Sequence, residues 1–77
     1  MKTHVLDDPD GALILDMETG MRVARFVDAG RCYRLYWSDG RSQNIAKGKG
    51  WDYTIAWIQA RIEAETLWDG DIPISLL

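Results

Sequence analysis

Apolar and polar residues alternate with a period of two through much of the first half of the chain. Residues 12–17 are largely apolar and are followed by a turn that contains glycine, and residues 21–27 and 31–37 each alternate between two faces. A period of two is typical of strands that bury one face. Residues 41–45 follow another glycine-containing turn and predict a short fourth strand at the edge. The pattern therefore predicts an antiparallel sheet of three or four strands over residues 12–45.

The pattern changes to a helical period near residue 51. Apolar side chains recur there at spacings of four, three and four residues, which places them on one helical face: Trp51, Ile55, Ile58 and Ile62. Asp52 is suited to cap the first turn, and Gly70 and Pro73 oppose continuation of the helix. We expect a helix over residues 52–67 whose isoleucine face covers the sheet. The sheet residues expected to contact that face are Leu13, Leu15, Val23 and Leu35.

The two ends of the chain lack these periods. Residues 1–11 contain three aspartates together with Pro9 and Gly11, which oppose regular structure, and we expect them to form an irregular acidic arm. Residues 69–77 form a tail that is apolar enough to lie back on the domain as an added edge strand. The chain is thus expected to be a single α+β domain, residues 1–77, in which the antiparallel sheet packs on one C-terminal helix.

The composition narrows the classes of protein. With 77 residues, 47% of them hydrophobic, and four tryptophans, the chain is too apolar to remain disordered, although a core of this size is marginal. Cys32 has no partner for an intrachain disulfide, and with the single His4 it cannot complete a four-ligand zinc site. The acidic start lacks the apolar run of a signal peptide, and no stretch approaches the roughly 20 apolar residues of a membrane helix. We expect a cytoplasmic protein without metal or cofactor.

Residue patterns that support catalysis are missing from the sequence. The single histidine lies near the start, and there is no Gly-x-Ser-x-Gly, His-Glu-x-x-His or structured Cys-His pairing. Residues 47–50, Lys-Gly-Lys-Gly, precede the helix and resemble an anion-binding loop. They lack the Gly-Lys-Ser/Thr ending of a P-loop, so a flexible connector is the preferred interpretation. We predict no catalytic residue and no enzymatic activity.

The charged residues favour a basic partner. The chain has 12 acidic and 9 basic residues and a net charge of −3, which gives no long-range attraction for phosphates. The carboxylates concentrate toward the two ends of the chain, at Asp7, Asp8, Asp10, Glu63, Glu65, Asp69 and Asp71. If the arm packs near the end of the helix, these side chains form one negative surface that can imitate a phosphate track. Solubility is the alternative explanation for them.

A second stripe on the predicted helix is aromatic. Trp57, Arg61, Ala64 and Trp68 follow spacings of four, three and four residues, about 120° or more from the isoleucine face. Either the tail covers this stripe or Trp57 and Trp68 stay partly exposed, flanking Arg61. Trp and Arg are enriched at interface hot spots, so exposed residues here would contact a partner or a second copy in a homodimer. Trp57, Arg61 and Trp68 therefore join the seven carboxylates as candidate binding residues.

Arginines form another candidate surface, on the sheet. Five of them fall in or beside the strands: Arg22, Arg25, Arg31, Arg34 and Arg41. Arg34 and Tyr36 share the face opposite Tyr33 and Trp37, where an arginine beside an exposed aromatic ring can stack on bases. The layout of strands followed by a helix resembles the arm-binding domains of phage-type integrases, which implies DNA binding through the sheet. Pairing of the arginines with neighbouring acidic residues is the alternative, and the net charge favours it.

In size, acidity, lack of cofactor motifs and sheet-plus-helix layout, the whole chain resembles small proteins of phages and mobile elements, among them the anti-CRISPR inhibitors. No shared motif carries a functional residue over. The resemblance implies stoichiometric binding to a basic surface of a CRISPR effector complex, which blocks its access to target DNA. We expect such an inhibitor, with no direct contact with nucleic acid or membrane. The alternatives are a small DNA-binding or regulatory domain that uses the Arg/Tyr face, and an assembly protein that dimerises through the tryptophans.

Overall fold

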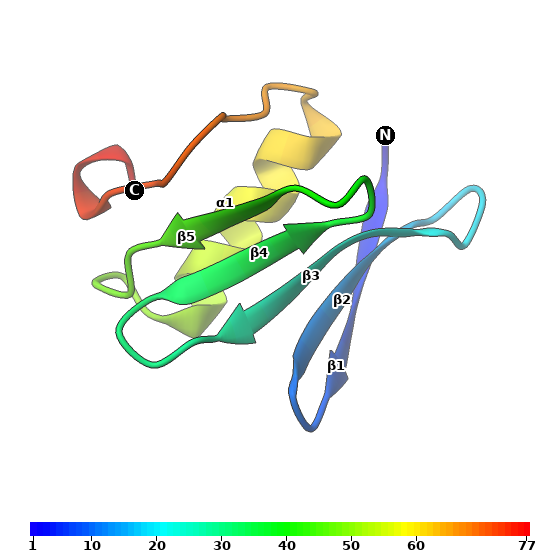
Figure 1. Cartoon of the computed structure of the whole chain (residues 1–77). Helices are drawn as coiled ribbons and strands as arrows, with labels where there is room; N and C mark the ends of the chain where they lie inside the picture. The colour runs from blue at the N-terminus through cyan, green and yellow to red at the C-terminus, as the bar shows by residue number, and fades with distance from the viewer.

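The computed structural model describes residues 1–77 and contains one sheet, one α-helix and a short 3₁₀ helix (Figure 1). The strands are β1 (Thr3–Asp8), β2 (Gly11–Asp16), β3 (Arg22–Asp28), β4 (Tyr33–Trp37) and β5 (Ser42–Ile45). They lie in the order β1-β2-β3-β4-β5, and each is antiparallel to the next. The helices are α1 (Trp51–Glu63) and η1 (Ile74–Leu76). The predicted α+β class, an antiparallel sheet with one C-terminal α-helix, is confirmed, and the sheet has five strands.

The additional strand comes from the N-terminal segment, which is not an irregular arm as expected. β1 pairs with β2 from Thr3 opposite Asp16 to Asp8 opposite Gly11. Pro9 lies in the tight turn between the two strands, where its missing N–H breaks no ladder bond. A Cβ atom at Gly11 would lie 2.3 Å from the carbonyl oxygen of Phe26, so this position requires glycine. Pro9 and Gly11, which were expected to oppose regular structure, therefore mark the turn of a hairpin.

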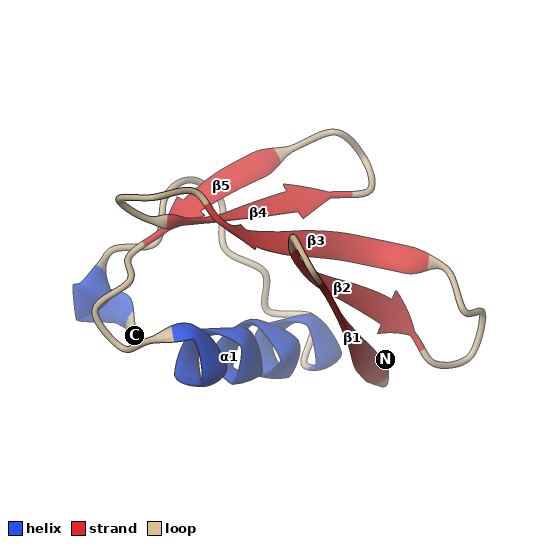
Figure 2. Cartoon of the chain, turned by 90° about the horizontal axis from the view of Figure 1, so that it is seen from below, coloured by secondary structure: helices blue, strands red, loops and turns tan.

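The core lies between one face of the sheet and α1, and Figure 2 shows the helix on that side with the opposite face uncovered. Its buried members are Ile14, Ala24, Phe26, Tyr33, Leu35, Trp37, Ile45, Ile58, Ile62 and Ile72. The expected burial of Ile58, Ile62 and Leu35 is confirmed. The expected contacts of Leu13 and Leu15 with the helix are wrong, because Ala12 and Ile14 face the core instead. All four positions are apolar, so alternation cannot decide which pair faces inward.

Val23, another residue expected beneath the helix, is half-buried next to an irregularity in the pairing of β2 with β3. The register shifts there between Ile14, which pairs with Ala24, and Leu15, which pairs with Arg22. A shift of one residue in a strand exchanges the faces of its side chains. Ala24 and Phe26 consequently occupy the core positions of β3.

α1 ends at Glu63, four residues before the predicted end. Glu65 adopts a left-handed conformation with φ 56°. The N–H of Thr66 donates to the carbonyl of Arg61 at 3.0 Å, and that of Glu65 to the carbonyl of Ile62 at 3.1 Å. These two bonds form a Schellman motif, which usually contains glycine at the left-handed position. A glutamate in that position gave no signal in the sequence, so the helix was predicted to continue.

The C-terminal tail returns to the sheet beside β5, as expected, but it adds one bridge rather than a full strand. Ile72 forms a parallel bridge with Ile45, and the N–H of Ile72 donates to the carbonyl of Asn44 at 2.8 Å. Beyond it, η1 packs so closely on Gly48 that a Cβ atom there would lie 1.9 Å from Ile74 Cδ1. Neither helix combines the length and the apolar character needed to cross a lipid bilayer.

Candidate functional site

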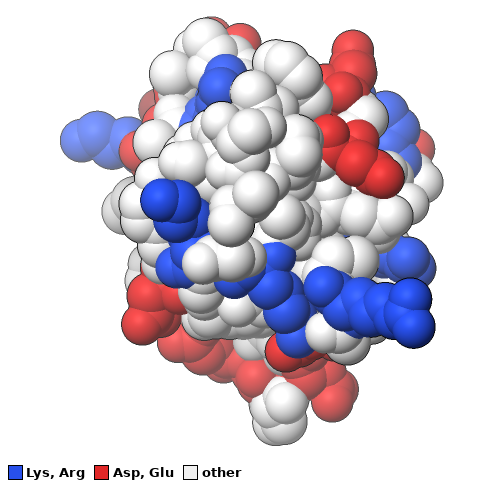
Figure 3. Space-filling view, turned by 90° about the vertical axis from the view of Figure 1, so that its left-hand side faces the viewer, with Lys and Arg blue, Asp and Glu red and all other residues white.

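The seven predicted carboxylates do not form one surface. Asp7, Asp8 and Asp10 lie at the β1–β2 turn, whereas Glu63 contacts Thr3 at the other end of β1. Five residue steps separate Thr3 from Asp8, which is about 17 Å along a strand. In Figure 3, basic side chains cross the middle of one face and separate acidic side chains near its lower border from those at the upper right. The expectation of a single seven-carboxylate surface is therefore wrong, because the N-terminal segment forms an extended strand.

Asp69 and Asp71 are separated from the turn as well, and both make local contacts. Asp69 forms an ion pair with Arg41 at 3.3 Å. Asp71 accepts a hydrogen bond from the backbone N–H of Asn44 at 3.2 Å, which helps to hold the tail on β5. Glu65 is exposed in the turn that ends α1.

A smaller acidic group forms where the β1–β2 turn meets the end of β3. A surface hollow of about 360 Å³ is lined there by Asp7, Asp8, Pro9, Asp10, Gly11, Asp28 and Trp51. We call Asp7, Asp8, Asp10 and Asp28 the acidic hairpin site. Asp28 was not among the predicted residues, because only the antiparallel pairing of β3 with β2 brings it beside the turn. Trp51 comes from the first turn of α1 and adds an aromatic ring to the hollow.

Two basic side chains partly neutralise the acidic hairpin site. Arg25 lies 3.3 Å from Asp8 and 4.0 Å from Asp10, and Lys47 pairs with Asp28. The hydrogen bond from Lys47, followed by that from the backbone N–H of Gly30, lowers the pKa of Asp28. The Asp10 side chain is 87% exposed, so its charge is directed to solvent. Carboxylates around an aromatic ring suit a guanidinium or ammonium group of a partner.

The tryptophans of the predicted helical stripe lie on different elements. Trp57 is on α1, half-buried against the core, and the guanidinium carbon of Arg61 lies 4.6 Å from the centre of its ring. Trp68 lies in the loop after α1, because the helix ends earlier than predicted, and it is 39% exposed. Both tryptophans are partly exposed, which is the second of the two alternatives left open by the sequence, but they do not form one stripe on a helix. Their contact with a partner or with a second copy stays a prediction.

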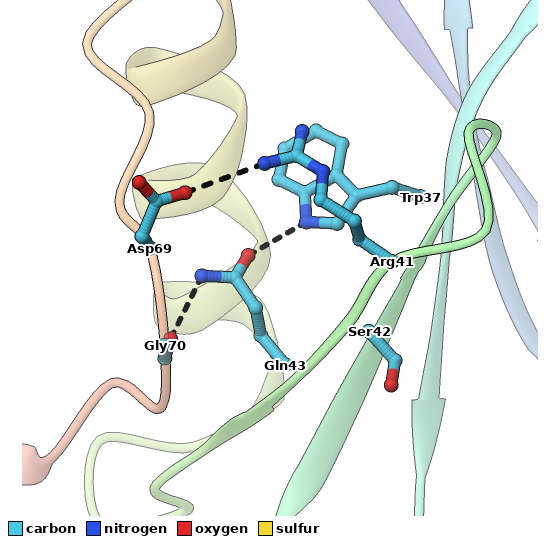
Figure 4. Close-up of a pocket in the computed structure, with 6 residues that line it drawn as sticks. All are labelled: Trp37, Arg41, Ser42, Gln43, Asp69 and Gly70. Carbon is cyan, nitrogen blue, oxygen red and sulfur yellow. Dashed lines mark hydrogen bonds and ion pairs between the residues drawn. The ribbon is translucent and has the colours of Figure 1, made fainter.

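A second hollow, of about 280 Å³, lies between β5 and the loop after α1 (Figure 4). Gln43 is buried at its centre and accepts a hydrogen bond from Trp37 Nε1 at 2.6 Å. Its Nε2 group donates to the carbonyl oxygens of Gly70, at 2.8 Å, and Trp68. Both ends of the Gln43 amide are therefore hydrogen-bonded within the protein, and Gln43 attaches the loop after α1 to the sheet.

The uncovered face of the sheet combines apolar and basic side chains. One row crosses four strands through the pairs Leu6–Leu13, Leu13–Arg25 and Arg25–Tyr36, and both Leu6 and Tyr36 are exposed. Arg34 lies on the same face, as predicted, and donates from Nε to Asn44 at 3.0 Å. Its interaction with the Tyr36 hydroxyl raises the pKa of the guanidinium. This face is the second candidate surface.

Comparison with protein family models, curated proteins and solved structures finds no match to this chain. Its function is therefore argued from its surfaces, because a fold by itself does not determine function.

Proposed function

We propose that this domain is a small acidic binding protein that inhibits a nucleic-acid-binding complex by occupying a basic surface of that complex. The observation that carries the proposal is the acidic hairpin site, in which four carboxylates from the β1–β2 hairpin and the end of β3 line a hollow together with Trp51. A CRISPR effector complex is the partner class implied by the chain's likeness in size, charge and layout to anti-CRISPR inhibitors. Such complexes hold nucleic acid in a positively charged channel.

The energetics require several contacts that act together. An exposed ion pair contributes about 0.2–1 kcal/mol, so no single carboxylate of the site would hold a partner. Charge complementarity would instead raise the association rate, and Trp51 would contribute apolar contact area within the same hollow. Asp8 pairs with Arg25 and Asp28 with Lys47, whereas Asp10 lies 4.0 Å from Arg25 and its side chain is 87% exposed. Asp7 and Asp10 are therefore the carboxylates best placed to meet a partner.

Capture of purified type I and type II CRISPR effector complexes, followed by a target-DNA binding assay, tests this proposal. The variant Asp7→Lys/Asp10→Lys should associate at least about tenfold more slowly, because steering acts on the encounter rate. The control Glu18→Lys/Glu65→Lys makes the same change in net charge at exposed positions outside the acidic hairpin site and should retain most of the inhibition. Equal loss in both variants, or no retained complex, would overturn the proposal.

The alternative function is a small DNA-binding or regulatory domain that uses the uncovered face of the sheet. The observation that favours it is the common location of Arg25, Arg34 and Tyr36 on that face. Such a domain would bind free DNA by itself, and its affinity would fall steeply with salt. Fluorescence anisotropy with labelled DNA distinguishes the two functions: binding that is lost in Arg34→Ala/Tyr36→Ala would support the alternative, and absence of binding would exclude it.

A further inference from the structure

The two edges of the sheet differ in how their backbone groups are paired. β5 is bridged by the tail, where Ile72 donates to Asn44 at 2.8 Å and accepts from Ala46 at 2.9 Å. β1 forms the opposite edge, and no strand lies on its outer side (Figure 1). Unpaired N–H and C=O groups at a sheet edge are a template for a further strand. β1 is therefore the edge at which another chain can pair.

The hydrogen-bond pattern identifies the groups of β1 that point outward. Successive residues of an antiparallel strand alternate between facing their partner and facing away from it. Met17 donates to the carbonyl of Lys2 at 3.0 Å, so the even-numbered residues face β2. The N–H of Thr3 points outward, to the Glu63 carboxylate at 2.7 Å. The N–H and C=O groups of Val5 and Asp7 also point outward, and none of the hydrogen bonds outside the sheet ladder involves them.

Along this edge, acidic groups lie on either side of an apolar one. Val5 and Asp7 lie on the helix side of the sheet, the side of their buried cross-strand partners, and Glu63 reaches Thr3 there. Thr3 and Asp7 are four residues apart, which is about 13 Å along the strand. A neighbouring strand would pair its backbone with Val5 and Asp7. Beyond Val5 it would meet the Glu63 carboxylate, which holds the Thr3 N–H and has the Met1 ammonium and Lys2 near it.

We propose that an extended basic segment of the partner binds β1 as a sixth strand. The segment carries Lys or Arg, an apolar residue, and Lys or Arg at positions i, i+2 and i+4, opposite Asp7, Val5 and Glu63. Opposite charges on directly facing residues stabilise a strand pair, and main-chain hydrogen bonds supply affinity in this mode of recognition. The inference rests on the proposed function, because it takes the partner to be basic, and it specifies which part of the partner is bound.

A second copy of the chain fits the same edge poorly. If two β1 strands paired antiparallel about Val5, Asp7 of one copy would lie opposite Thr3 of the other, where Glu63 is already bonded. Two carboxylates would then face each other on each side of the pair, which is destabilising. The Met1 ammonium and Lys2 lie near Glu63, so the preference for a basic segment over another copy of the chain comes mainly from the Asp7 end of the edge.

The test uses synthetic peptides and the full chain. A labelled peptide with the core Lys-Val-Val-Thr-Lys should bind in fluorescence anisotropy, and a peptide with both lysines replaced by glutamate should not. Two further peptides each carry a single N-methyl group, on the first or on the second valine. Because strand residues alternate in direction, one of the two should lose at least about tenfold in affinity and the other little. Equal effects of the two N-methyl groups would overturn the proposal.

Amide hydrogen exchange locates the bound peptide on the protein. The amide protons of Val5 and Asp7 should exchange faster than those of His4 and Leu6 in the free chain. They should become protected when the peptide is added. Protection of Val5 and Asp7 that rises with protein concentration in the absence of peptide would show a second copy on the edge, and would overturn the proposal.

Charge reversal on the edge gives a matched comparison. Asp7→Lys should weaken binding of the basic peptide at least about fivefold, whereas Glu18→Lys, with the same change in net charge, should have little effect. Equal weakening by both variants would contradict specific recognition at the edge. Failure of the proposed function would appear separately, as absence of any retained complex. If Asp7→Lys/Asp10→Lys loses inhibition but the two N-methylated peptides bind equally well, the proposed function stands and only the binding of a sixth strand is overturned.

Discussion

At the residue scale, Gln43 shows how one buried amide can position a loop that has no regular structure. Its side chain accepts from the indole of Trp37 and donates to two carbonyl groups of the loop after α1. The same loop carries Trp68, whose ring is partly exposed. The location of this tryptophan is thus set by a polar residue on a strand 25 residues away, and no helical spacing could have indicated it.

Replacement of Gln43 by alanine should lower the free energy of unfolding by about 1–3 kcal/mol, because the buried N–H of Trp37 loses its acceptor. Urea unfolding followed by tryptophan fluorescence measures the change. Ser42→Ala, on the neighbouring exposed position, is the control and should change stability by less than about 0.5 kcal/mol. Equal stability of the two variants would show that the network does not hold the loop.

At the element scale, β1 and α1 are joined by one polar cluster although they lie at opposite ends of the sequence. Glu63 accepts hydrogen bonds from the backbone N–H and the hydroxyl of Thr3, at 2.7 and 2.9 Å, and Gln59 donates to the same hydroxyl at 3.0 Å. The bond from the backbone N–H, followed by that from the hydroxyl, lowers the pKa of Glu63 below its ordinary value of 4.5. The ionised form of Glu63 is therefore favoured in the folded state.

This lowered pKa fixes the sign of a pH dependence. The contribution of Glu63 to stability should be fully present above pH 4.5, its ordinary pKa, and lost as the pH falls through the lowered value. The variant Glu63→Gln removes the ionisation, so its difference from the wild type in urea midpoint should narrow below pH 4.5. Glu18→Gln, in an exposed turn, should show no such narrowing. A constant difference across this range would contradict the assigned hydrogen bonds.

At the scale of the whole molecule, the tail completes both the core and one edge of the sheet. Ile72 is 4% exposed and belongs to the buried cluster, and it also bridges β5. Ile74, two residues later, is 52% exposed. Two isoleucines close in sequence thus differ in environment because one lies on the sheet edge and the other in η1.

We expect Ile72→Ala to lower the free energy of unfolding by about 2–5 kcal/mol, as for other buried isoleucines. Ile74→Ala should cost clearly less than Ile72→Ala, because Ile74 is 52% exposed and only part of its side chain packs, on Gly48. Thermal or urea unfolding of the two variants under the same conditions measures both values. Similar losses in the two would mean that the tail does not dock through Ile72.

Periodicity in the sequence was sufficient to predict the α+β class, the strands within residues 12–45 and the helix that begins near residue 51. It also placed Arg34 and Tyr36 on the face opposite Tyr33 and Trp37, because alternation along a strand is a local property. The inward faces of Ile58 and Ile62 were predicted for the same reason, since helical spacing depends on the backbone alone.

Only the tertiary structure decided the features that depend on pairing between distant segments. Residues 3–8 form a strand because β2 supplies their hydrogen bonds, and residues 12–15 bury Ala12 and Ile14 rather than the two leucines because of the register. The same pairing separates Asp7 and Asp10 from Glu63 and brings Asp28 beside them. Local propensity does not encode these distances, because they arise from contacts across the sheet. The sequence alone therefore determined β2 to β5 and the start of α1, whereas the pairing of the sheet determined β1 and which charges share a surface.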